Sequence, residues 1–144
     1  MSSLNIIPRN LLGPGPSNVH PRVLQAGAFL VIGHLDPQFL ELMNKNQEML
    51  STVFQTQNEV TLPMSGTGSA GMQAALANFI EPGDPVLVCV MGYFGERMFE
   101  MANRLGAQVE RIDKPWGQAF TRKEIAAALA KRPAKLVALV HGET

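Results

Sequence analysis

The sequence predicts an α/β protein with a largely parallel sheet and helices on both of its faces. The run PVLVCV (85–90) is continuously apolar and KLVALV (135–140) is apolar after Lys135, as expected of strands that are covered on both sides. Around them, apolar residues recur at helical spacing, so that strands and helices alternate along the chain. In a sheet of this kind the ligand lies at the edge formed by the carboxyl ends of the strands.

The first 20 residues are rich in proline and glycine, so we expect an N-terminal arm or loop at 1–20 and a domain at 21–144. Asp36 and Pro37 fit the N-cap and first position of a helix, and apolar residues then recur at helical period to about Phe54. The segment VTLPM (60–64) is expected to form a short strand.

The elements that follow are also marked by local signals. Gly106 fits the position just after a helix C-cap, and Thr121 with Glu124 forms a capping-box signature. We therefore expect helices at about 69–79, over 98–105 and from Thr121 to about Lys131, and strands at 85–90, 107–112 and 135–140. The ligand edge would then carry SGTGS, MGYFGE, the loop after Ile112 and HGET.

Composition excludes several classes of function. Twelve basic and 12 acidic residues balance without a run of like charge, so neither nucleic acid nor a membrane surface is an expected partner. The single Cys89 lies in an apolar run and is expected to be a buried structural thiol, and we expect no metal site. With no apolar run of about 18 residues and no signal-peptide pattern, we expect a cytoplasmic protein, with peroxisome and mitochondrion as alternatives.

A glycine-rich segment, MSGTGSAGMQAAL (64–76), is the first candidate for a ligand site. Its glycines fit the G-x-G-x-x-G pattern of dinucleotide-binding turns. That pattern also requires an acidic residue about 20 positions later for the ribose hydroxyls, and residues 90–92 are Val-Met-Gly. A P-loop would require a lysine after the last glycine, and none follows. The sequence therefore disfavours a nucleotide.

The same turn fits a single phosphate group. The backbone amides of Thr67, Gly68 and Ser69 lead into a helix N-terminus, where free N–H groups and the helix dipole favour an anion. In the alternative interpretation, the glycines only permit a tight turn and the hydroxyls only cap the helix. The residues alone leave both interpretations open.

Four segments in one order carry a resemblance to a known family: LLGPGPSNVHPRVL, VFQTQNEVTLPMSGTGSAGMQAALANFIEPGD, MGYFGER and LVHGET. Together they resemble the N-terminal part of the class V, fold-type-I pyridoxal-phosphate aminotransferases, and most closely the alanine–glyoxylate, serine–pyruvate and serine–glyoxylate group. The resemblance extends from about Leu11 to Thr144. It implies that the chain is the N-terminal portion of the large cofactor domain of that fold.

The resemblance implies roles for individual residues. Phe94 corresponds to the aromatic residue that stacks on the cofactor ring, and Thr144 to a hydroxyl near the phenolic oxygen. Gly15 and Gly33 correspond to backbone positions that help to bind the substrate carboxylate. The positions that correspond to the phosphate-binding residues are Thr67, Gly68 and Ser69.

Two of these positions depart from many relatives, which have a histidine where Ser69 stands and a tryptophan where Phe94 stands. Phenylalanine has a smaller aromatic face and no N–H, so the resemblance implies a changed cofactor affinity or substrate preference. Taken by itself, Phe94 also fits an ordinary core aromatic.

In the family, the Schiff-base lysine and the acidic partner of the pyridine nitrogen lie downstream of HGET (141–144). We therefore assign no catalytic residue, and we expect a truncated chain that is inactive alone. The complete protein is expected to be a homodimeric aminotransferase that moves an amino group from alanine or serine to glyoxylate or pyruvate. The alternative is a non-catalytic α/β module that binds a phosphate or nucleotide at SGTGS (65–69).

Overall fold

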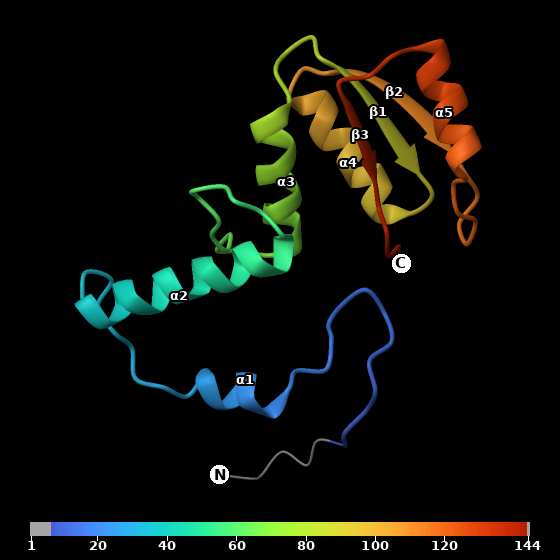
Figure 1. The fold of residues 1–144 in the computed structure, drawn as a ribbon. Helices are drawn as coiled ribbons and strands as arrows, with labels where there is room; N and C mark the ends of the chain where they lie inside the picture. The colour runs from blue at the N-terminus through green and yellow to red at the C-terminus, as the bar shows by residue number, and fades with distance from the viewer. Residues whose placement is uncertain (1–6, 144) are drawn as a thin grey trace. The chain divides into compact units, whose positions relative to one another are not determined.

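A computed structural model describes residues 7–143 of the chain, which fall into two compact units (Figure 1). The α/β unit is formed by the segment up to Ser17 together with the chain from Thr67 onward. The helical unit is Asn18–Gly66. The division expected from the sequence, after residue 20, stays a prediction.

The α/β unit is built on a three-stranded parallel sheet in the order β2-β1-β3. The central strand β1 (Pro85–Val90) pairs with β2 (Gln108–Asp113) on one side and with β3 (Leu136–Leu139) on the other. Figure 1 shows the three strands side by side between helices. The α/β fold with a parallel sheet, expected from the two apolar runs, is confirmed.

Helices cover both faces of the central strand but not of β3, where Val137 and Leu139 are 38% and 47% exposed, so the buried strand expected at 135–140 is wrong in that respect. On one face, β1 packs against α3 (Gly68–Phe79) and α4 (Tyr93–Arg104), and on the other it packs against α5 (Arg122–Lys131). The expected capping box is present, because the Thr121 side chain accepts the N–H of Glu124 and the Glu124 carboxylate accepts the N–H of Thr121.

The core follows from the alternation of side chains along β1. Val86, Val88 and Val90 face the cluster that contains Leu76 of α3 and Met98 of α4. The intervening side chains of β1, Leu87 and Cys89, pack against α5. Cys89 is fully buried, as expected, and this burial raises the pKa of its thiol.

The helical unit has a different character. It contains α1 (Pro21–Ala26) and α2 (Pro37–Phe54), and none of its residues is buried. Each helix begins with a local cap: His20 Nδ1 accepts the N–H of Arg22 at 3.2 Å, and Asp36 Oδ1 accepts the N–H of Gln38 at 2.8 Å. Helix α2 has the expected bounds, whereas α1 was not among the expected elements.

The strand expected at residues 60–64 is wrong, because the structure shows irregular backbone there. Pro63 has no N–H to donate to a neighbouring strand, and no described segment of this unit offers a ladder partner. The apolar side chains that prompted the prediction remain exposed, with Val60 at 72%. Across residues 7–143, no helix combines the length and hydropathy needed to cross a bilayer.

Candidate functional site

The candidate site is a pocket of about 730 Å³ in the α/β unit. Three parts of the chain that are distant in sequence form most of its wall: residues 13–15, the first turns of α3 and the segment that follows β3. Phe94, at the start of α4, completes the lining. The pocket lies where the ligand edge of the sheet was expected, at the carboxyl end of β3.

The first turn of α3 supplies hydrogen-bond donors. Thr67 is the N-cap, and its Oγ1 accepts the N–H of Ala70 at 3.4 Å. Within residues 7–143, the structure records no partner for the N–H groups of Gly68 and Ser69, as is usual for the first positions of a helix. The two interpretations of this turn are therefore compatible, because the Thr67 side chain caps the helix and two backbone donors stay available.

Phe94 is half-buried and lies outside both clusters of the hydrophobic core. Its ring makes an edge contact with Tyr93, with the centroids 5.8 Å apart at an angle of 70°. Because Phe94 lines the pocket, it stands where a planar ligand could contact its ring.

The structure brings most of the expected site residues together. Gly15, Thr67, Gly68, Ser69 and Phe94 all line the pocket. Their binding roles remain predictions.

Two expected site residues are not brought to the pocket by the described structure. Gly33 belongs to the helical unit, where it accepts the N–H of Asp36 through its carbonyl. Thr144 lies outside the described residues. Their substrate and cofactor roles stay predictions as well.

Five lining residues were not among the expected site residues: Gly13, Pro14, Met72, Val140 and Gly142. The helical spacing of Met72 from Ser69 and the position of Gly142 within HGET are the signals that identify these two. The loop after Ile112, which was expected at this edge, contributes no lining residue.

No lysine is among the described residues that line the pocket. Lys114 pairs with Glu124 at 2.8 Å and lies over the ring of Phe120, and Lys135 pairs with Asp84 at 2.6 Å. These lysines therefore serve local ion pairs. Within residues 7–143, no cluster of three or more histidine, cysteine or acidic side chains could hold a metal ion.

The two ion pairs depress the pKa values of their carboxyl groups. The hydrogen bond from Lys114, followed by bonds from the backbone and hydroxyl of Thr121, lowers the pKa of Glu124 to about 2. The hydrogen bond from Lys135, followed by the N–H of Glu81, lowers the pKa of Asp84. Neither carboxylate lines the pocket, so both act on the stability of the scaffold.

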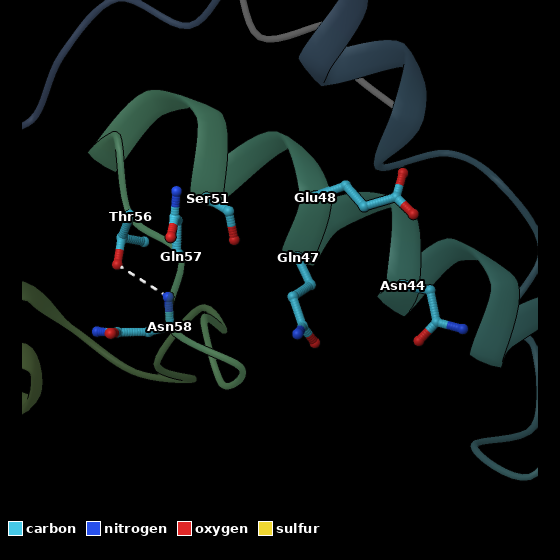
Figure 2. Close-up of a pocket in the computed structure, with 7 residues that line it drawn as sticks. All are labelled: Asn44, Gln47, Glu48, Ser51, Thr56, Gln57 and Asn58. Atoms are coloured by element: carbon cyan, nitrogen blue, oxygen red, sulfur yellow. Dashed lines mark hydrogen bonds between the residues drawn. The ribbon is translucent and has the colours of Figure 1, made fainter.

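A second pocket, of about 540 Å³, lies within the helical unit between α2 and the segment after it (Figure 2). Its lining consists of side-chain amides and hydroxyls with one carboxylate, that of Glu48. The Asn58 N–H donates to Thr56 Oγ1 at 3.2 Å, and the Gln47 amide donates to the carbonyl of Glu59. No expected site residue lies here.

No protein-family model matches the chain. Individual relatives do match it. The chain is 43% identical to the alanine–glyoxylate aminotransferase of Mus musculus over 141 residues, which are 98% of this chain and 34% of that protein. It is 43% identical to the (S)-ureidoglycine–glyoxylate transaminase of Bacillus subtilis over 136 residues, which are 94% of this chain and 33% of that protein.

A solved structure agrees with these relatives. The crystal structure of an alanine–glyoxylate aminotransferase from Nostoc sp. matches with a TM-score of 0.86 and 51% identity, over 99% of this chain and 38% of that one. The chain thus spans about a third of the length of the relatives it matches. The resemblance expected from the sequence is confirmed, and the chain is a homologue of the class V aminotransferases of the alanine–glyoxylate and ureidoglycine–glyoxylate type.

Proposed function

We propose that this chain is part of a pyridoxal-phosphate aminotransferase that transfers an amino group from a small amino acid, alanine or serine, to glyoxylate or pyruvate. The observation that carries the proposal is the pocket that joins the N-terminus of α3 to Phe94 and residues 13–15. The names of the homologues, which include two glyoxylate transaminases, support the acceptor.

The donors of the pocket fit a phosphate group. Two backbone N–H groups without a recorded partner in the described chain, those of Gly68 and Ser69, lie beside the hydroxyls of Thr67 and Ser69. No acidic side chain is among the described lining residues. A negative group at a helix N-terminus gains about 0.3 to 1 kcal/mol at an exposed site. The volume of about 730 Å³ suits a small cofactor together with a substrate.

When bound, pyridoxal phosphate supplies a conjugated ring that withdraws electrons from the amino-bearing carbon of the substrate. This chain's own residues would bind the cofactor and the substrate and hold them in a fixed orientation. The first turn of α3 would anchor the phosphate, and Phe94 would hold one face of the ring, so that the plane of the ring is fixed. The backbone near Gly15 would contact the substrate carboxylate. Met72 and Val140 would exclude water from that side of the pocket.

The remaining groups of the active site would come from outside the residues that line this pocket. We assign the Schiff-base lysine and the acidic partner of the ring nitrogen to parts of the enzyme other than residues 1–144, and Gly33 and Thr144 to the completed site. The chain would form the first part of the large cofactor domain, with its arm at 1–20. A second copy of the protein would cover the helical unit, whose Leu30 and Val31 are 92% and 100% exposed.

The proposal is tested by equilibrium dialysis of the 144-residue chain against pyridoxal phosphate. We expect saturable, non-covalent binding that inorganic phosphate weakens by competition. Thr67→Ala should weaken binding severalfold, whereas Thr121→Ala, which removes an equivalent N-cap from α5, should leave it unchanged. Equal effects of the two substitutions would contradict the site. A pyridoxyl adduct on a lysine of this chain after borohydride reduction would contradict the assignment of the lysine elsewhere.

The second candidate function is a non-catalytic module that binds a phosphate or nucleotide at residues 65–69. The absence of a lysine among the described lining residues favours it. The codons after Thr144 separate the two: a strand ending in aspartate and then a Ser-x-x-Lys-like segment supports the aminotransferase, and a stop codon supports the module. In the dialysis experiment, competition by a dinucleotide at a lower concentration than inorganic phosphate would also favour the module.

A further inference from the structure

Glu143, which the proposed function leaves without a role, connects two walls of the pocket. Its Oε1 accepts the N–H of Gly95 at 2.7 Å, and its Oε2 accepts the N–H of Phe94 at 3.1 Å. These contacts join residues 48 and 49 positions apart in the sequence. One carboxylate thereby ties the segment after β3 to the first turn of α4.

Two glycines leave the space that this carboxylate occupies. A Cβ on Gly92 would lie 2.5 Å from Glu143 Oε2, and a Cβ on Gly95 would lie 3.3 Å from Oε1 and 3.1 Å from the Cα of Val90. Gly92 has a φ of 177°, an extended conformation that any residue adopts. Its lack of a side chain is therefore explained by the room that Glu143 needs and not by its backbone conformation.

Helix α4 also lacks the side-chain cap that the other two helices of the unit have. Thr67 caps α3 and Thr121 caps α5, whereas the N-cap of α4 is Gly92, which has no side chain. Glu143 takes over this role from a distant part of the chain. Carboxylate bonds to backbone N–H groups are stronger than neutral ones, and a negative charge at a helix N-terminus is favourable.

We propose that Glu143 is a positioning residue for Phe94. By holding the N–H groups of Phe94 and Gly95, the carboxylate fixes the first turn of α4 to the chain that carries Val140 and Gly142, and so fixes the ring of Phe94 in the pocket. The link between the two walls stands on the geometry alone. The consequence for cofactor binding rests on the proposed function.

The link is tested by hydrogen exchange measured by NMR on the 144-residue chain. Glu143→Gln keeps the size of the side chain but replaces one of the two acceptor oxygens with an NH2 group, which can only donate. We expect the N–H groups of Phe94 and Gly95 to exchange about tenfold faster or more, as for the loss of a bond to a charged group. Glu124→Gln, which alters the equivalent cap of α5, is the matched control and should leave both unchanged. Unchanged exchange in Glu143→Gln would overturn the link.

Gly92→Ala tests the same contact from the other side. Its Cβ should displace the carboxylate and accelerate exchange at Phe94 and Gly95 without altering Glu143 itself. This variant keeps the proposal testable if Glu143→Gln folds poorly. Normal exchange in Gly92→Ala would mean that the space is not needed and would contradict the argument.

The positioning role is tested by the affinity for pyridoxal phosphate in a double-mutant cycle of Glu143→Gln and Phe94→Ala. Glu143→Gln alone should weaken binding severalfold and change the ring absorbance of the bound compound. In the Phe94→Ala background it should add no further loss, because Glu143 acts through Phe94. Additive losses, or an unchanged affinity despite faster exchange, would overturn the positioning role. If the unsubstituted chain binds no pyridoxal phosphate, the proposed function fails, while the exchange experiment still decides whether the link exists.

Discussion

The two units of the chain form their secondary structure in different ways. Every buried apolar side chain of the described residues lies in the α/β unit, from Leu76 to Ala138. The helical unit has two capped helices and no buried residue. In the α/β unit the helices are stabilised by packing on a sheet, whereas α1 and α2 depend on their caps and on whatever surface covers them. The candidate pocket, with five of the seven expected site residues, lies in the unit that has a core of its own.

The largest difference in stability between the two units is expected when a large apolar side chain is shortened to alanine. Leu87→Ala, at a side chain that is 1% exposed in β1, should lower the free energy of unfolding by about 2 to 5 kcal/mol. Leu24→Ala removes the same atoms from α1, where the side chain is 63% exposed, and should change it by less than about 0.5 kcal/mol. Urea denaturation followed by circular dichroism measures both. Equal losses would mean that the helical unit has a core as well.

An effect of intermediate size on stability is expected at the residues that end α4 and α2, both of which have a positive φ. Gly106 follows α4 with a φ of 81°, and a Cβ there would lie 3.2 Å from the Cβ of Pro82. Gly106→Ala should therefore destabilise the chain by about 1 to 3 kcal/mol. Gln55 ends α2 with a φ of 51°, so Gln55→Gly should relieve strain and stabilise α2 by about 1 kcal/mol. Thermal denaturation monitored at 222 nm gives the sign of each change, and a shift in the same direction for both would contradict this comparison.

A smaller effect on stability is expected at acid pH, and it arises from the Glu124 carboxylate in the α/β unit. The ordinary pKa of the Glu124 carboxyl is 4.5, and its bonds in the folded protein lower the pKa to about 2. The unfolded chain therefore binds the proton first, so this stabilisation is complete above about pH 4.5 and is lost as the pH falls toward 2.

Glu124→Gln should flatten this part of the pH dependence, measured as urea midpoints at pH 6 and pH 3. Lys114→Met, which removes the main cause of the low pKa, should flatten it too. If the unsubstituted chain and both variants lose stability equally between pH 6 and pH 3, the capping box and the ion pair do not stabilise the folded state.

The smallest effect on folding is expected at the most exposed apolar position of the helical unit. Val31 is 100% exposed, so Val31→Lys should change the free energy of unfolding by less than about 0.5 kcal/mol. If a second copy covers this unit in the complete protein, the same substitution should weaken dimerisation there, measured by sedimentation equilibrium. A loss of stability greater than about 1 kcal/mol in the isolated chain would contradict the exposure of this segment.

The sequence predicts those features whose causes are local. Asp36 with Pro37 marked the start of α2, Thr121 with Glu124 marked the start of α5, and the unbroken apolar run of β1 marked the central strand. The strand expected at residues 60–64 was wrong because strand formation needs a partner, and an apolar pattern does not reveal whether a partner exists.

The residues around the pocket also divide into those that a local pattern predicts and those whose role depends on a distant contact. Thr67, Gly68 and Ser69 could be chosen from the sequence because a glycine turn before a helix has a local pattern. Glu143 could not, since its role depends on a contact with Phe94 and Gly95 across 48 and 49 positions. The signal that could have indicated it is the glycine pair of MGYFGER, which leaves room for a side chain from elsewhere.

The most direct test of the proposed cofactor site is an NMR titration of the 144-residue chain with pyridoxal phosphate. We expect the amide signals of Gly68 and Ser69 and the ring signals of Phe94 to shift together and to saturate at one common concentration. Shifts confined to the second pocket, which is lined by residues from Asn44 to Asn58, or no shift at the first turn of α3, would contradict the proposed site.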